Sequence, residues 1–314
     1  MNEPIFLQPV FQERIWGGQK LKQLFGYDIP YERTGECWAV SAHPNGQSIV
    51  KSGPHQGMKL GELWGSHPEL FNSSSKVFPL LTKLLDASDD LSVQVHPDDA
   101  YAGVHENGEL GKTECWYIVD AEPGACIIYG HEAKTKQELE AMFAAGDWDT
   151  LLTKVPVKAG DFFYVPSGTI HALGKGIVVL ETQQSSDTTY RVYDYDRKDK
   201  DGNTRELHLE KAIDVTTVPQ SYQPQAYEVK EQENAVITSF VSNSFFTVEK
   251  WNIDGAAIFP QIEKYTICSV IDGSGELSVG GDRYPLAKGD HFILPVSFDA
   301  FQLKGKLELI ISHE

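Results

Sequence analysis

Two separated segments of the sequence carry side chains that could bind one metal ion. Gln94 and His96 are two residues apart, so on a strand both would point to the same face. Glu114 begins a strand-like run, and His171 follows a strand and a turn. Two imidazoles, a carboxylate and an amide oxygen are a suitable set of ligands for a divalent metal with one open coordination position. The sequence therefore predicts a catalytic metal site.

Two of these residues have alternative readings. Glu114 could be a solvated residue at the edge of a sheet, and Gln94 could hydrogen-bond a ligand instead of binding the metal. The remaining histidines lie outside comparable motifs and are expected to be surface or core residues.

The segments that must position these side chains have the composition of β-strands. Residues 92–129 are dense in β-branched and aromatic side chains. Residues 136–143 differ, because they are rich in helix formers and place Leu139, Met142 and Phe143 at helical spacing. We therefore predict a helical insertion at about residues 132–153. The short strands and Gly-rich turns elsewhere favour a double-sheet jelly roll.

The C-terminal part contains a weaker copy of the middle part. Residues 286–295 parallel residues 157–166, with Gly and Pro at matching positions. The copy lacks the ligands, because Thr266 stands where Glu114 would be and Ala300 where His171 would be. Residues 219–224 read as a linker. We expect a catalytic domain at residues 1–218 and a degenerate β-domain without metal ligands at residues 219–314.

Composition narrows the class of protein. The chain has 314 residues, and its formal net charge of -18 argues against binding to nucleic acid or to anionic membrane surfaces. An anionic substrate would therefore need a local cluster of Lys and Arg. The four scattered cysteines fit reduced thiols, and residues 1–4 lack a basic leader region, so we expect a cytoplasmic protein.

The motifs together resemble a known family. Residues 160–171 have the pattern G-x5-P-x-G-x2-H, which matches the second cupin motif. With residues 14–18, 92–98 and 112–114, the chain resembles the type I phosphomannose isomerases in their short bacterial form, over essentially its full length. The resemblance implies a mainly β fold, with a cupin jelly-roll barrel, a small helical insertion and a second, degenerate cupin-like β-domain. It also implies interconversion of mannose 6-phosphate and fructose 6-phosphate with one zinc ion per subunit.

The same resemblance assigns roles to individual residues. The zinc ligands of the family fall on His96, Glu114 and His171, and Gln94 takes the place of a fourth ligand found in longer members. The catalytic arginine falls on Arg191 and the acidic residue of the pocket on Glu181. Positions associated with the substrate and its phosphate fall on Ser92, Lys112 and Arg197.

This chemistry has a physical basis. Isomerisation by proton transfer moves a proton from C2 of the aldose to C1 through a cis-enediol, and the difficult species is the enediolate anion. A bound dication stabilises such charge by several kcal/mol. Arg191 stays protonated, so it suits charge stabilisation better than proton abstraction. Glu181 and a zinc-bound water both remain candidates for the base.

Two other functions remain open from the residues. Two histidines and a carboxylate also bind Fe(II), as in a cupin dioxygenase. A non-catalytic sugar-binding cupin would not require Arg191, Glu181 and Lys112 as a set. If the protein is the isomerase that the resemblance implies, its partner is a small sugar phosphate. We expect no nucleic acid, membrane or obligate protein partner.

Overall fold

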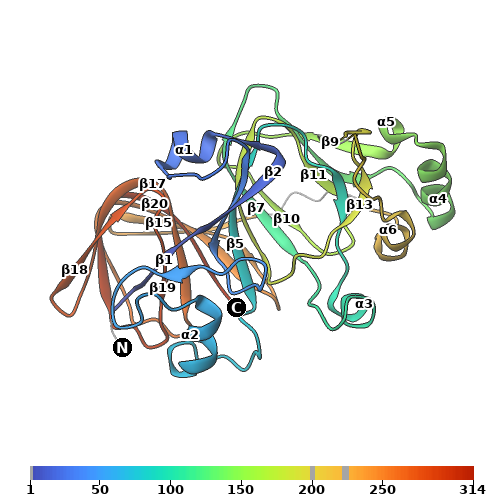
Figure 1. Cartoon of the computed structure of the whole chain (residues 1–314). Helices are drawn as coiled ribbons and strands as arrows, with labels where there is room; N and C mark the ends of the chain where they lie inside the picture. Colours follow the sequence, from blue (N-terminus) through green and yellow to red (C-terminus); the bar gives the residue numbers. More distant parts are fainter. Residues whose placement is uncertain (1–2, 199–201, 221–225) are drawn as a thin grey trace.

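Antiparallel β-sheets make up most of the molecule, which is described here from a computed structural model covering residues 3–198, 202–220 and 226–314 (Figure 1). The prediction of a mainly β fold is confirmed. Three sheets of nine, six and five strands account for the described strands.

The six-stranded and five-stranded sheets form the barrel that contains the candidate site. In spatial order, the six-stranded sheet contains β10 (Phe162–Val165), β7 (Glu114–Ala121), β12 (Ile177–Gln184), β5 (Leu80–Ala87), β3 (Thr34–Val40) and β2 (Val10–Gly18). The five-stranded sheet contains β13 (Tyr190–Tyr193), β6 (Val93–Val95), β11 (His171–Leu173), β8 (Cys126–His131) and β9 (Leu152–Pro156). One apolar cluster joins the two sheets, with Trp116 and Val179 from the first and Ile127 and Leu173 from the second.

The nine-stranded sheet combines the C-terminal part with two N-terminal strands. Its members are β14 (Glu228–Gln232), β15 (Ala235–Ser242), β16 (Thr247–Phe259), β20 (Phe301–His313), β17 (Thr266–Val279), β19 (His291–Leu294), β1 (Ile5–Gln8) and β4 (Ile49–Val50), with β18 (Asp282–Ala287) beside β17. Strand β1 pairs with β19, so the start of the chain belongs to the same sheet as its end. The division of the chain at residues 218 and 219 stays a prediction. Residues 221–224 of the predicted linker lie outside the described part of the chain.

The helices are short and lie outside the barrel (Figure 1). They are α1 (Lys20–Phe25), α2 (Leu60–Ser66), the 3₁₀ helix η1 (Pro68–Leu70), α3 (Asp99–His105), α4 (Lys136–Ala145), α5 (Trp148–Leu151) and α6 (Leu209–Val215). Helices α4 and α5 occupy the interval in which the sequence predicts a helical insertion. Helix α4 starts where Thr135 Oγ1 accepts a hydrogen bond from the Glu138 amide, and it ends at Gly146 with φ 65°. None of the helices in the described ranges is long and apolar enough to cross a membrane.

The predicted internal copy folds as the sequence indicates. Gly160 and Gly289 have φ of 91° and 92°, a conformation that favours glycine. In the first copy Asp161 Oδ2 accepts a hydrogen bond from the Lys158 amide at 2.9 Å, and in the second Asp290 Oδ2 accepts one from the Ala287 amide at 2.8 Å. The strands after both turns pair in the same register, because Val165 lies opposite Glu114 and Leu294 lies opposite Thr266. The second, degenerate cupin-like unit is therefore a structural repeat.

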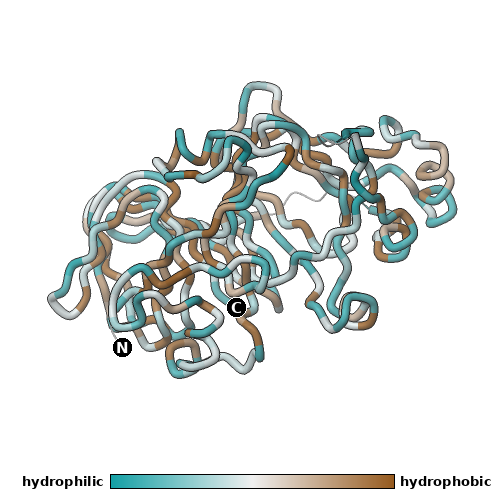
Figure 2. The backbone as a smooth tube through the Cα atoms, in the orientation of Figure 1, coloured by the Kyte–Doolittle hydropathy of each residue, from teal (hydrophilic) through white to brown (hydrophobic). Residues whose placement is uncertain are grey.

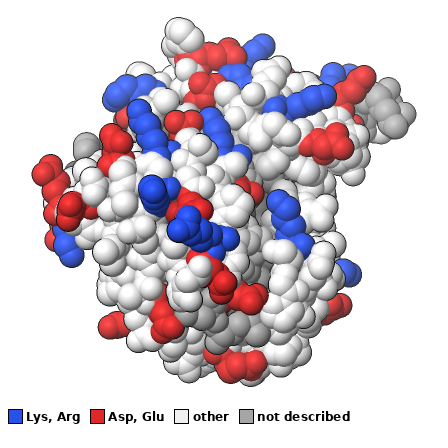
Figure 3. Space-filling view, turned by 90° about the vertical axis from the view of Figure 1, so that its left-hand side faces the viewer, with Lys and Arg blue, Asp and Glu red and all other residues white. Residues whose placement is uncertain are grey.

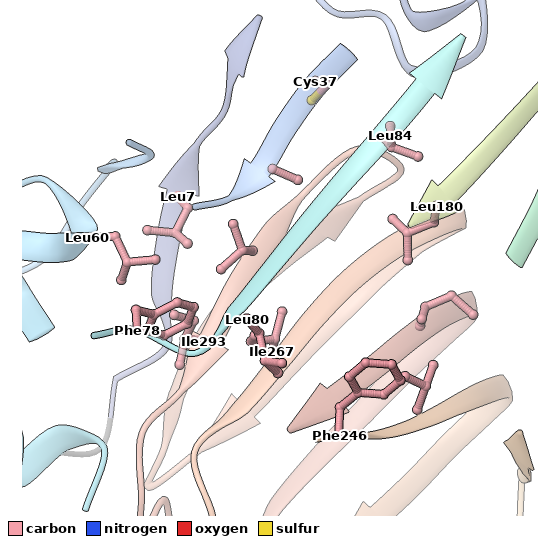
Figure 4. Close-up of a cluster of buried hydrophobic side chains, with 14 of the residues drawn as sticks. Leu7, Cys37, Leu60, Phe78, Leu80, Leu84, Leu180, Phe246, Ile267 and Ile293 are labelled. Carbon is pink, nitrogen blue, oxygen red and sulfur yellow. The ribbon is translucent and has the colours of Figure 1, made fainter. Parts of the chain in front are cut away.

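The sheets are held together by apolar side chains that face one another. Hydrophobic and hydrophilic residues alternate along much of the strand traces (Figure 2). The largest cluster connects the six-stranded and nine-stranded sheets and includes Leu84 and Leu180 from one and Ile267 and Ile293 from the other (Figure 4). Burial of this interface makes the two parts of the chain depend on each other for stability.

Charged side chains of both signs cover the surface. On the face shown in Figure 3, Lys and Arg are interspersed with Asp and Glu, and they form no broad basic area there. The protein has a formal net charge of -18, and the face in Figure 3 has no large cationic surface.

Candidate active site

The predicted metal ligands come from strands of two sheets. His171 begins β11 and lies directly opposite Gln94 of β6 in the five-stranded sheet. His96 follows β6, whereas Glu114 begins β7 in the six-stranded sheet. The ligand atoms of His96, Glu114 and His171 all lie within 4.8 Å of one another, and the three side chains are buried. The fold brings together residues that are up to 75 positions apart in the sequence.

Backbone carbonyls fix the tautomers of both imidazoles. Nδ1 of His96 lies 2.9 Å from the carbonyl oxygen of Thr188, and Nδ1 of His171 lies 2.8 Å from that of Thr169. A carbonyl can only accept a hydrogen bond, so both Nδ1 atoms carry the proton. The lone pair of each neutral ring therefore lies on Nε2, which faces the centre of the site.

Electron pairs converge at this centre. Nε2 of His96 lies 3.4 Å from Glu114 Oε2, and Nε2 of His171 lies 3.3 Å from Glu114 Oε1. Both carboxylate oxygens are buried, and neither has a hydrogen-bond partner among the described residues, although Lys112 Nζ forms an ion pair with Oε2 at 3.2 Å. Two neutral imidazoles and a carboxylate that face one another fit a divalent cation.

Gln94 lies close enough to complete this donor set. Its Nε2 lies 3.4 Å from His171 Nε2. The oxygen and nitrogen of an amide can exchange places by a flip, and the flip would turn the Gln94 oxygen toward the centre. The geometry thus allows both predicted roles of Gln94, as a fourth ligand or as a hydrogen-bonding neighbour.

Burial and the charge of Lys112 keep the three ligands in the protonation states that bind a metal. Burial and the Lys112 ammonium lower the pKa of His96 to about 3, and burial lowers the pKa of His171. Burial opposes ionisation of Glu114, but Lys112 outweighs it and holds the pKa of that carboxyl well below its ordinary value. Near neutral pH the site contains neutral imidazoles and an ionised carboxylate, the protonation state in which these groups bind metals.

A cavity of about 350 Å³ lies beside the metal ligands. The predicted residues in its wall are Ser92, Gln94, Lys112, Glu181 and Arg191. Its polar lining suits a hydrophilic substrate, and its mixture of cations and carboxylates suits a ligand with both an anionic group and hydroxyls.

Arg191 is held next to the metal ligands by β13. It pairs with Gln94 of β6, Nε donates to Ser92 Oγ at 3.3 Å, and Nη1 donates to the Glu206 carbonyl oxygen at 2.8 Å. These contacts fix the orientation of the guanidinium. No described carboxylate forms an ion pair with it, so its charge is available to a ligand in the cavity.

Glu181 lies on β12 with neighbours on both sides that orient its carboxylate. Trp116 Nε1 donates to Oε2 at 3.0 Å, and Lys83 Nζ lies 3.6 Å from Oε1. Trp116 and Lys83 are its direct cross-strand partners on β7 and β5. Burial and the negative charge of Glu114 raise the pKa of Glu181. A carboxylate with a raised pKa is a better base than an ordinary one.

The two other predicted cations lie in different places. Lys112 Nζ is 3.2 Å from His96 Nε2, so its charge acts at the metal ligands. Burial opposes its ammonium form, but Glu114, Glu181 and Asp187 outweigh it and raise the pKa of Lys112. Arg197 is absent from the residues that line the cavity. Its guanidinium donates to Asp194 and to the Asp90 carbonyl oxygen, and its role in phosphate binding stays a prediction.

The cavity wall contains five further charged residues that were not predicted from the sequence, which are Arg14, Glu36, Lys83, Asp187 and Arg205. A signal existed for two of them. Strands β5 and β3 are mostly apolar and every residue in them is buried, so the charged Lys83 and Glu36 could have been recognised as groups with a special role. Arg205 follows a polar loop, and nothing in the sequence indicates that it reaches the cavity.

Both ends of the chain match models of known families. Residues 5–119 match the family described as phosphomannose isomerase type I, catalytic domain. Residues 236–314 match the family described as mannose-6-phosphate isomerase, cupin domain. The second match covers the copy that lacks metal ligands.

Similar proteins cover the whole chain. A mannose-6-phosphate isomerase from Streptococcus mutans is 60% identical over 316 residues, which include 100% of this chain and 99% of that protein. Mannose-6-phosphate isomerase ManA from Bacillus subtilis is 55% identical over 313 residues, 99% of each chain. The crystal structure of the mannose 6-phosphate isomerase from Bacillus subtilis superposes with a TM-score of 0.97 at 55% identity, over 99% of each chain. On this evidence of sequence, fold and site, the chain belongs to the type I phosphomannose isomerase family.

Proposed function

We propose that this protein interconverts mannose 6-phosphate and fructose 6-phosphate, with one zinc ion per subunit and a cis-enediol intermediate. The observation that carries the proposal is the convergence of His96, Glu114 and His171 beside a polar cavity whose wall contains Gln94, Arg191 and Glu181. The similarity to mannose-6-phosphate isomerases over the full chain supports the choice of substrate.

The three convergent residues would hold the zinc ion, with Gln94 as the fourth ligand. A dication there would supply Lewis-acid stabilisation of negative charge on the oxygens at C1 and C2 of the sugar. Zinc suits this role because it has no redox chemistry. The fixed Nδ1 protons of both histidines are independent support, since they leave Nε2 free to bind.

Glu181 is the proposed proton carrier between C2 and C1. It lines the cavity, its carboxylate is oriented by Trp116 and Lys83, and burial raises its pKa. A single base on one face of a cis-enediol can remove the proton from one carbon and return it to the next. The ion pair of Lys83 with this carboxylate favours its ionised form, and therefore return of the proton after each transfer.

Arg191 and Lys112 provide the charge that the anionic intermediate requires. Both cations line the cavity, and Arg191 has no competing ion pair among the described residues. A preorganised cation near developing negative charge lowers the barrier without reorganisation during the reaction. Ser92 fixes Arg191 through its hydroxyl and is a proposed contact for the substrate.

The two alternative functions have less support. An Fe(II) dioxygenase could use the same three ligands, but the family membership favours an isomerase. A non-catalytic sugar-binding protein would leave the buried Glu181–Lys83 pair beside the metal ligands without a role.

Metal analysis combined with a coupled assay tests the proposal. We expect about one zinc per chain, turnover of mannose 6-phosphate in both directions, and transfer of label between C2 and C1 with partial exchange into solvent. Iron in the purified protein together with oxygen consumption and no isomerisation would instead support the dioxygenase. Binding of the sugar phosphate to zinc-loaded protein without turnover would support the sugar-binding alternative.

A further inference from the structure

The cations of the cavity differ in how well they are already neutralised. Arg14 makes two hydrogen bonds to the Glu36 carboxylate, at 2.8 and 3.3 Å. Lys83 lies between Glu36 and Glu181, and Lys112 pairs with Glu114. These three cations have carboxylate partners of their own, so each of them attracts a phosphate less strongly than an unpaired cation would.

Arg191 and Arg205 are less fully neutralised by carboxylates than the other three cations of the cavity. Arg191 forms no ion pair with a described carboxylate, and Arg205 shares its only one, Asp194, with Arg197. Within the described part of the chain, no hydrogen bond uses Nη2 of Arg191 or Nη1 of Arg205. Burial and the charge of Arg205 lower the pKa of Arg191, as expected for two cations held close together. An anion between them would relieve this repulsion.

The backbone brings Arg197 and Arg205 to the same carboxylate. Lys198 and Thr204 form an isolated β-bridge, and Arg197 and Arg205 are the residues next to it on either side. Both guanidiniums therefore meet the buried carboxylate of Asp194. Arg205 donates from Nε to Oδ2 at 2.7 Å and from Nη2 to Oδ1 at 2.5 Å, a bidentate contact that fixes its plane.

Arg197 uses its remaining donors on the protein itself. Its guanidinium also contacts the carbonyl oxygens of Asp90 and Asp194. These bonds anchor Asp194, which in turn orients Arg205 toward the cavity. Arg197 thus has a structural role in this arrangement, whereas Arg205 has a free donor at the cavity wall.

The distance of the two arginines from the metal ligands suits the phosphate end of a six-carbon sugar phosphate. Ser92 bonds to Arg191 and precedes the candidate ligand Gln94 by two residues on the same side of the chain, a separation of about 7 Å. In a hexose 6-phosphate the reacting carbons and the phosphorus lie at opposite ends of the carbon chain. A substrate with C1 and C2 at the metal ligands can therefore extend past Arg191 and reach Arg205 with its phosphate.

We propose that Arg205 is a specificity-determining residue that binds the phosphate of the substrate, while Arg197 and Asp194 position it. The proposal rests on the proposed function for the identity of the sugar, but the anion site itself does not depend on catalysis. Nothing in the sequence motifs points to Arg205, and the structure identifies it by its bidentate anchor and its place in the cavity wall.

Arg205→Gln tests the proposal, with Arg283→Gln as the matched control. Arg283 is an exposed arginine on β18, far along the chain from the cavity, and its replacement changes net charge equally. Because Asp194 keeps Arg197 as a partner, we expect R205Q to fold, and thermal melting checks this. The probes are inorganic phosphate, measured by titration calorimetry, and mannose 6-phosphate, measured by steady-state kinetics.

We expect R205Q to raise the Kd of inorganic phosphate and the KM of mannose 6-phosphate about 10- to 100-fold, the loss typical of a charge-assisted hydrogen bond. Arg205→Lys should recover part of this loss, because it keeps the charge without the fork. R283Q should match the wild type. Unchanged phosphate affinity in folded R205Q would overturn the proposal, even if the protein is an active isomerase. Phosphate binding that depends on Arg205 in a protein without isomerase activity would support this site and overturn the proposed function.

Discussion

At the scale of single residues, the cavity separates the groups that hold the metal from the groups that act on the substrate. His171 belongs to the cluster of metal ligands and is not among the residues that line the cavity, whereas Arg191 is one of them. Removing one or the other should therefore have different consequences for metal content and for turnover.

His171→Ala should lose most of the bound metal, whereas Arg191→Ala should keep it and lose about 10²- to 10³-fold in kcat, as when one preorganised electrostatic group is removed. Metal content by atomic spectroscopy and kcat from the coupled assay measure the two effects. Full activity of R191A would show that the guanidinium does not stabilise the intermediate.

Glu181→Gln isolates the proton carrier, because the amide keeps the shape of the side chain and its oxygen can still accept from Trp116 Nε1. Loss of a general base should reduce kcat about 10²- to 10⁴-fold. The Kd of inorganic phosphate should stay near the wild-type value, since this group lies at the reacting end of the cavity. If kcat changed less than about tenfold, another group must carry the proton.

Short sequence motifs were sufficient to predict the residues that could bind a metal. Strand periodicity predicts that Gln94 and His96 face the same way, and the structure has His96 directly after β6, within reach of Glu114 and His171. Those two residues were picked out by their motifs. The residues that were missed, such as Lys83 and Arg205, reach the cavity through strand order and loop anchoring. Those features depend on tertiary contacts that a single sequence does not display.

At the scale of elements, the two repeated turns provide an internal comparison. Gly160 and Gly289 have almost the same φ, yet a Cβ at Gly160 would meet nothing within 4 Å, while a Cβ at Gly289 would lie 3.1 Å from Cε1 of Tyr27. Tyr27 cannot easily move, because its hydroxyl donates to the Gly289 carbonyl oxygen at 2.9 Å. The same substitution therefore carries a backbone cost at both turns and a steric cost at only one.

Gly160→Ala should lower the free energy of unfolding by about 1–3 kcal/mol, the cost of a positive φ in a residue with a side chain. Gly289→Ala should lower it by about 1–3 kcal/mol more, the typical cost of overpacking. Urea unfolding followed by fluorescence compares the two variants. Equal losses would mean that Tyr27 relaxes without penalty.

Sequence patterns were most informative for elements with strong local signals. The helix at Lys136–Ala145 has helix formers, a Thr cap and a terminal glycine, and the repeated turn has its Gly-Asp pair. The pairing of β1 with β19 was not predicted, because a strand of four residues carries no record of a partner that is more than 200 positions away. Strand β4 joins the same sheet through β1.

At the scale of the whole molecule, the second copy has replaced a metal site by an aromatic core. Phe259 lies opposite Phe301, and their rings lie 5.3 Å apart at 16°. Trp251 stacks on Phe259 with centroids 4.3 Å apart. This unit contributes packing against the catalytic barrel through the largest hydrophobic cluster.

A buried polar chain crosses the same interface. Nδ1 of His291 lies 2.9 Å from Ser269 Oγ, and its Nε2 lies 2.8 Å from the hydroxyl of Tyr27, which comes from the N-terminal part. The Tyr27 hydroxyl donates to the Gly289 carbonyl oxygen, so it accepts from Nε2–H, and Nδ1 accepts from Ser269. The structure therefore requires a neutral imidazole, and burial lowers the pKa of His291 to about 3.

This requirement makes the stability of the fold depend on pH. An unfolded histidine takes up a proton near pH 6.5, whereas folded His291 remains neutral down to about pH 3, so the unfolded state binds one more proton between these values. The contribution of His291 should therefore lower the free energy of unfolding by about 1.4 kcal/mol for each pH unit below 6.5.

His291→Gln removes the titrating group and should reduce the pH slope of the free energy of unfolding between pH 4 and 6 by the equivalent of one proton. His105→Gln, which changes an exposed imidazole, is the control and should leave the slope unchanged. Urea unfolding at several pH values measures both, and an unaltered slope in H291Q would mean that the imidazole is already protonated in the native protein.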